Sequence, residues 1–141
     1  MNLHRLMLIV ILFAGFGLGL GLPWLHRHMD ENHAREAVRT ARTLAQAEQA
    51  FFEQNGYYTA DFATLLPQTK CVETVLDGQS ALTCPGYTLQ LKEAQQIWVQ
   101  SNKYPQWFTV SLDTGAVTCQ FEEGSLVGPK LCAAAHVPNY I

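Results

Sequence analysis

The sequence has little charge and no run of basic residues. Charged residues make up 15% of its 141 positions, and the formal net charge at pH 7 is -3. A protein that binds DNA or RNA through the phosphates needs a stripe of Lys and Arg side chains to neutralise them. The composition therefore argues against nucleic acid as a main partner.

The sequence also lacks a recognisable set of catalytic residues. No Ser or Cys has a convincing base and orienting partner in the sequence. Glu122 and Glu123 are adjacent, so in a strand they point to opposite faces and suit a polar rim better than a carboxylate pair. We expect no enzymatic activity and no cofactor.

Three histidines and an aspartate lie close together in the sequence, namely His26, His28, Asp30 and His33. Only His26 and Asp30 share one face of a helix, because they are four residues apart. A metal site needs several such ligands to converge. These residues more simply form a polar collar beside a membrane, and we expect no metal ion.

The one long apolar run is N-terminal, since Leu6 to Leu25 contain no charged residue. A helix of about 20 such residues spans the hydrocarbon core of a bilayer. Basic residues before the run favour an N-terminus on the cytoplasmic side. We expect residues 1–25 to be a single-pass inner-membrane helix and residues 26–141 to form one exported, periplasmic domain.

A cleaved signal peptide is the alternative interpretation of this run. Gly19 and Gly21 are small residues that imitate a cleavage site. The run is longer than the 7 to 15 apolar residues that are usual in a signal peptide, however, which favours the membrane helix.

Glycines recur at four-residue spacing inside the run, in the pairs Gly15 with Gly19 and Gly17 with Gly21. This spacing lets membrane helices approach closely. Glycine also loosens a helix, and Pro23 removes a backbone donor. The segment therefore predicts a face for helix association or a bend. The alternative is that these are small residues tolerated in a lipid-facing helix, since glycine is common in membrane helices.

A second helical pattern follows the apolar run. Its apolar residues recur every three or four positions and form one stripe, made of Ala34, Ala37, Val38, Ala41, Leu44, Ala45, Phe51 and Phe52. The sequence Asn55-Gly56 is typical of a helix end, because both residues tolerate the left-handed conformation. We expect the helix to end there.

From Tyr87 the apolar residues alternate with polar ones. Four strands are predicted, centred on Tyr87 to Leu91, Ile97 to Val99, Phe108 to Leu112 and Val117 to Phe121. The short links between them can join only antiparallel neighbours. We expect an α+β fold in which a four-stranded antiparallel sheet covers the amphipathic helix. Residues 124–141 are predicted to form a loop tied down by Cys132.

All four cysteines follow the apolar run, and none lies in a Cys-x-x-Cys pair. Zinc ribbons usually bring their ligands as two close pairs, so zinc is disfavoured. Disulfides in an oxidising compartment suit the sequence better. Three connectivities are possible, and we expect Cys71 with Cys84 and Cys119 with Cys132, because each bond then closes a short loop worth about 3 kcal/mol.

Two tryptophans, Trp98 and Trp107, alternate with the apolar residues of adjacent predicted strands. They therefore point to the sheet face opposite the helix. There they could form an aromatic patch for a partner subunit or a ligand. Coverage by the tail or by the segment after the helix remains the alternative.

The run from Ala41 to Tyr58, ARTLAQAEQAFFEQNGYY, followed by Leu65-Leu66-Pro67 and a late cysteine pair, resembles the type IV pilin and type II secretion pseudopilin family. The chain departs from that family in having no glutamate inside the apolar run, and its Gly15-Phe16 pair lies deep within the run. These departures point to a minor or atypical subunit.

The resemblance implies a structural subunit of a type IV pilus or a type II secretion pseudopilus. Its partners would be other pilin or pseudopilin subunits and the inner-membrane assembly machinery, and the assembled filament would be extracellular. The expected assembly helix comprises Gly15, Gly19, Pro23, Ala34, Ala37, Val38 and Ala41. The alternative is a single-pass, membrane-anchored periplasmic binding or adaptor protein that does not polymerise.

Overall fold

The computed structural model describes residues 2–59, 61–65, 70–92 and 95–137. The chain divides into two compact units, Met1–Asp30 and Glu31–Ile141, called here the N-terminal unit and the C-terminal unit. Helix α1 (Leu3–Asn55) supplies the N-terminal unit and the first helix of the C-terminal unit. Its end at Asn55 confirms the predicted boundary, and Gly56 there has a φ of 78°.

The sheet of the C-terminal unit has six strands, whereas the sequence predicted four. The strands are β1 (Val72–Leu76), β2 (Gln79–Cys84), β3 (Tyr87–Lys92), β4 (Gln96–Ser101), β5 (Gln106–Ser111) and β6 (Val117–Phe121). They pair in chain order, and every pair is antiparallel. The predicted meander is therefore confirmed as β3 to β6 and extended by one hairpin.

The additional hairpin joins β1 and β2 through a two-residue turn. Leu76 pairs with Gln79, so Asp77 and Gly78 form the loop. Both have positive φ, 51° and 77°. An Asp-Gly pair takes this conformation readily, and the resulting twist matches that of the strands.

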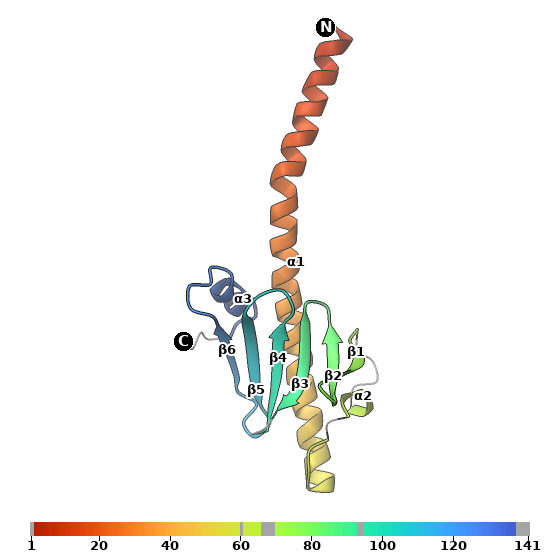
Figure 1. Cartoon of the computed structure of the whole chain (residues 1–141), viewed down its shortest axis with the longest axis vertical. Helices are drawn as coiled ribbons and strands as arrows, with labels where there is room; N and C mark the ends of the chain where they lie inside the picture. The colour runs from red at the N-terminus through yellow and green to blue at the C-terminus, as the bar shows by residue number, and fades with distance from the viewer. Residues whose placement is uncertain (1, 60, 66–69, 93–94, 138–141) are drawn as a thin grey trace. The chain divides into compact units, whose positions relative to one another are not determined.

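The core of the C-terminal unit lies between α1 and one face of the sheet (Figure 1). The stripe of α1 supplies mainly small side chains, such as Ala34, Ala37 and Ala41. The strands supply larger ones, including Leu89 and Phe108. The alanines add little bulk to the core, and the larger strand side chains fill the space between the helix and the sheet.

The C-terminal tail differs from the predicted loop, because α3 (Gly128–Ala134) is helical. A Pro in its first turn suits a helix start, where no backbone donor is needed. Gly128 is required by packing: a Cβ atom there would lie 2.5 Å from Cβ of Phe121. Residues 138–141 of the predicted loop lie outside the described residues. The short helix α2 (Phe62–Leu65) buries Phe62 in the core.

Candidate functional site

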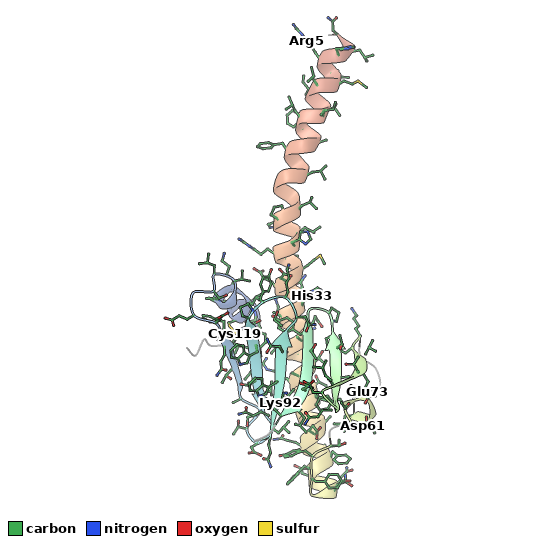
Figure 2. The ribbon with its side chains drawn as sticks, viewed as in Figure 1. Arg5, His33, Asp61, Glu73, Lys92 and Cys119 are labelled. Carbon is green, nitrogen blue, oxygen red and sulfur yellow. A yellow bond between two sulfur atoms is a disulfide. The ribbon has the colours of Figure 1, made fainter. Side chains whose placement is uncertain are left out.

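The N-terminal unit carries an apolar surface that the described chain leaves uncovered. Large side chains from Leu3 to Met29 are exposed, and Phe13 reaches 76% exposure. Figure 2 shows these side chains radiating from α1. By length and composition this helix could cross a membrane, and it is the one such helix among the described residues. The coarse prediction of a membrane-compatible N-terminal helix is confirmed.

The glycines of this unit make no packing contact within the chain. A Cβ atom added at Gly15, Gly17, Gly19 or Gly21 would meet no atom within 4 Å. Helix α1 continues through Pro23, so no turn is melted there. The small residues are therefore available to a neighbouring helix.

The residues of the predicted polar collar do not converge on a common centre. Trp24 and His28, one turn apart, stack with ring centroids 5.5 Å apart and an angle of 3° between their planes. Within the described part of the chain, no group of three His, Cys, Asp or Glu side chains could hold a metal ion.

Part of the predicted assembly helix is buried within its own chain. Ala34, Ala37, Val38 and Ala41 are at most 2% exposed and belong to the core of the C-terminal unit. The predicted cover of this stripe by the sheet is confirmed, and an assembly role of these four residues stays a prediction. An amphipathic stripe needs one apolar cover, and here the sheet of the same chain provides it.

The uncovered face of α1 in the C-terminal unit is polar. Arg39 forms an ion pair with Glu36 at 3.0 Å. Arg35 donates from Nε to the carbonyl oxygen of Ala134, at 3.1 Å, and so links α1 to the end of α3. A subunit that approaches this face would meet charges and hydrogen-bonding groups.

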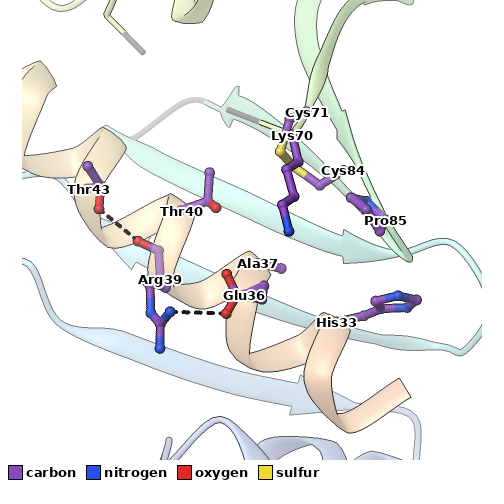
Figure 3. Close-up of a pocket in the computed structure, with 10 residues that line it drawn as sticks. All are labelled: His33, Glu36, Ala37, Arg39, Thr40, Thr43, Lys70, Cys71, Cys84 and Pro85. Carbon is purple, nitrogen blue, oxygen red and sulfur yellow. Dashed lines mark hydrogen bonds and ion pairs between the residues drawn. A yellow bond between two sulfur atoms is a disulfide. The ribbon is translucent and has the colours of Figure 1, made fainter. Parts of the chain in front are cut away.

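A groove of about 430 Å³ opens beside α1 (Figure 3). Its lining residues are His33, Glu36, Ala37, Arg39, Thr40, Thr43, Lys70, Cys71, Cys84 and Pro85. The two cysteines are bonded to each other and cannot act as nucleophiles. Thr43 donates to the backbone oxygen of Arg39 and has no contact with a base. The groove is thus lined by both polar and apolar side chains and offers no nucleophile–base pair among its described residues.

The two predicted disulfides are confirmed. Cys71 bonds to Cys84 and Cys119 bonds to Cys132, each across 13 positions of sequence. The first bond closes the β1–β2 hairpin, and the second ties α3 to β6. Such bonds are typical of proteins in oxidising, extracytoplasmic compartments.

The two predicted surface tryptophans lie together. The rings of Trp98 and Trp107 are parallel within 5°, and their centroids are 6.4 Å apart. Both side chains are partly exposed. Helix α2 contacts β2 and α3 contacts β6, whereas α1 packs on the opposite face (Figure 1). No described helix therefore covers the tryptophans.

One buried acid was not singled out from the sequence. Glu48 is 0% exposed, and its Oε2 accepts a hydrogen bond from the backbone N–H of Thr59 at 3.0 Å. Its Oε1 has no partner in the described structure. Burial raises the pKa of Glu48, although the bond from Thr59 opposes this. Its burial could have been predicted from the sequence, because Glu48 lies four residues after Leu44 and so falls within the apolar stripe of the helix.

Comparisons of the chain with protein-family models, with curated proteins and with solved structures give no match. Its function must therefore be argued from these surfaces.

Proposed function

We propose that this protein is a structural subunit of a filament of the type IV pilus or type II secretion pseudopilus kind. It would be held in the inner membrane by its N-terminal unit before assembly, with its C-terminal unit in the periplasm. Assembly would join it to other pilin or pseudopilin subunits. The observation that carries this proposal is that the large apolar side chains of the N-terminal unit are exposed on all faces of its helix.

The arrangement of the glycines supports packing of helices on two sides. Residues two positions apart on a helix differ by about 200° in direction. Gly15 and Gly19 therefore lie opposite Gly17 and Gly21. A helix inside a bundle has neighbours on more than one side, and small residues let each neighbour approach closely.

The C-terminal unit is suited to form the outside of such a filament. Its core and two disulfides stabilise it within one chain. Its own sheet already covers the stripe of α1, so contacts between subunits at this level would use the polar face that contains Glu36 and Arg39. We therefore place close helix packing in the N-terminal unit alone.

The test compares two substitutions that add bulk to the same helix. Gly19→Leu fills the space between helices, whereas Leu18→Phe adds bulk in a direction about 60° to 100° from each of the four glycines. Leu favours a helix over Gly by about 1 kcal/mol, so a loss of assembly could not result from a loss of helix. We expect Gly19→Leu to abolish the protein's presence in filaments sheared from cells, and Leu18→Phe to preserve it. Intact mass of sheared and membrane fractions is the measurement.

The uncovered Trp98–Trp107 pair favours a second candidate, a single-pass periplasmic binding or adaptor protein. Under that function the wild-type protein, with its apolar segment intact, would be found in the membrane fraction alone. Detection of the wild-type protein in sheared filaments would exclude it.

A further inference from the structure

The sheet face opposite α1 carries two neighbouring rows of side chains. We call this surface the tryptophan face. Following the strand register, one row is Thr74, Ala81, Gln90, Trp98, Thr109 and Thr118, and the other is Val72, Thr83, Thr88, Gln100, Trp107 and Gln120.

None of these twelve positions is ionisable, although 15% of the whole chain is charged. Instead, amides and hydroxyls predominate. Lys92 lies on β3 beyond the two rows, near the lower end of the sheet in Figure 2. Ala81, Gln90 and Thr109 are at most 9% exposed, so the accessible part of the tryptophan face is the second row together with Thr74, Trp98 and Thr118. This accessible part is a neutral polar surface within an acidic protein.

Each tryptophan has hydrogen-bonding neighbours on the adjacent strands. Trp107 lies between Gln100 and Gln120 in the register, and its indole N–H donates to Oε1 of Gln120 at 2.7 Å. This bond fixes the ring and leaves the amide nitrogen of Gln120 able to donate outward. Trp98 lies between Gln90 and Thr109, which are at most 9% exposed, so hydrogen-bonding groups open to a ligand lie mainly beside Trp107.

Four of the five hydroxyl groups of the face are arranged in pairs, and the fifth, that of Thr88, donates to Oδ1 of Asn102 at 2.8 Å. Thr109 and Thr118 share a hydrogen bond, and Thr74 and Thr83 share another of 3.0 Å. Each hydroxyl retains acceptor capacity after this bond. The face therefore presents parallel aromatic rings within a fixed array of hydrogen-bonding groups.

We infer that the tryptophan face binds a neutral carbohydrate chain. A pyranose ring has an apolar face of C–H groups, which packs on an indole ring, and a rim of hydroxyls, which bond to amides and hydroxyls. Parallel rings 6.4 Å apart on adjacent strands can contact successive sugars of one chain. The absence of charge on the face matches a ligand without charge.

Other occupants fit this surface less well. A phosphorylated, sulfated or carboxylated ligand would need Lys or Arg side chains, and the two rows contain none. A second copy of the chain placed on the same face would bury amides of Gln100 and Gln120, which are exposed here, and each would need a new partner.

The binding experiment uses the full chain in lipid nanodiscs, because many detergents carry sugar headgroups. A Trp24→Phe background makes intrinsic fluorescence report on Trp98 and Trp107. The probes are cellohexaose, chitohexaose and maltohexaose, with a heparin hexasaccharide as the charged comparison. We expect saturable fluorescence change with at least one neutral probe, with a dissociation constant of about 1 mM or tighter.

Two kinds of variant locate the site. Trp107→Ala should weaken binding by about tenfold or more. Gln100→Ala changes an exposed position and leaves the core intact, and it should weaken sugar binding by a few fold. This variant keeps the test valid if Trp107→Ala unfolds. Tyr57→Ala removes an exposed aromatic away from the sheet and should leave binding unchanged.

Three results would overturn the inference. The first is no saturable response to any of the three neutral probes, and the second is a response to heparin alone. The third is binding by Gln100→Ala and by a folded Trp107→Ala that is as strong as binding by the protein without these substitutions. A fluorescence change with protein concentration and without sugar would assign the face to a second copy. Sugar binding is measured on unassembled protein and should persist in Gly19→Leu. A failure of the carbohydrate inference can therefore be distinguished from a failure of filament assembly.

Discussion

The two parts of α1 show opposite relations between side-chain size and exposure. In the N-terminal unit large side chains such as Phe13 and Phe16 are more than 70% exposed. In the C-terminal unit alanines such as Ala34 and Ala41 are 0% exposed. Small residues occur where the sheet of the same chain covers the helix, and large ones occur where lipid or other helices would supply the cover. An apolar helix surface can therefore serve either its own fold or its surroundings.

The largest effect is expected from a charge in the buried part of α1. Ala41→Glu would place an unpaired carboxylate in a filled core and should cost about 4 kcal/mol or more. Ala50→Glu, at an exposed position of the same helix, should change stability by at most about 0.5 kcal/mol. Thermal unfolding followed by tryptophan fluorescence measures both. Equal melting of the two variants would show that the sheet does not cover Ala41.

Removal of the disulfides should destabilise the C-terminal unit and leave membrane association unchanged. Closing a loop of this length contributes about 3 kcal/mol to the free energy of unfolding for either bond. Cys119 and Cys132 are fully buried, so their double alanine variant also leaves a cavity and should melt lower than the Cys71→Ala/Cys84→Ala variant. A lower melting temperature for the Cys71→Ala/Cys84→Ala variant in calorimetry would contradict the deeper burial of Cys119 and Cys132.

A charge in the N-terminal unit should act on membrane insertion alone. Leu12→Arg would cost about 3 kcal/mol at the centre of a membrane helix, which should lower the fraction that resists alkaline extraction. The melting of the C-terminal unit should not change. Leu126→Arg makes the same substitution at an exposed leucine of the other unit and is the control. Full retention of Leu12→Arg in the membrane fraction would argue against a spanning helix.

The smallest effect is expected at Glu48. Because burial raises its pKa, the folded state binds more protons than the unfolded state. Stability is then greatest below the ordinary pKa of a glutamate and falls as pH rises through the raised pKa. Glu48→Gln should therefore gain about 1 kcal/mol at pH 7 and change little at pH 4. Glu53→Gln, which is exposed, should show no such dependence in thermal melts.

The sequence was sufficient to predict the helix and strands that bury one face and expose the other. The stripe of α1 and strands β3 to β6 each bury one face in the same core, so their apolar residues recur at the helical or strand period. Trp98 and Trp107 could be placed on the opposite face for the same reason.

The remaining elements lack such a pattern. Strand β1 is an edge strand exposed on both faces, so its residues do not alternate, and only the Asp77-Gly78 turn indicated the hairpin. Helix α3 is seven residues long, which is too short for a clear helical period. The cover of Ala34 and Ala41 by the sheet of the same chain was predicted from the stripe, whereas the assembly role of these residues stays a prediction.

The pairing of all six strands in chain order has a consequence for how this protein acquires its structure. Synthesis delivers the chain from its N-terminus, so α1 is complete before any strand exists. Each hairpin can then form as soon as its second strand emerges, without waiting for distant sequence. Contacts of this local kind favour fast folding. Cys119 lies on the last strand and Cys132 follows it in α3, so the bond between them can form only after all six strands have been synthesised.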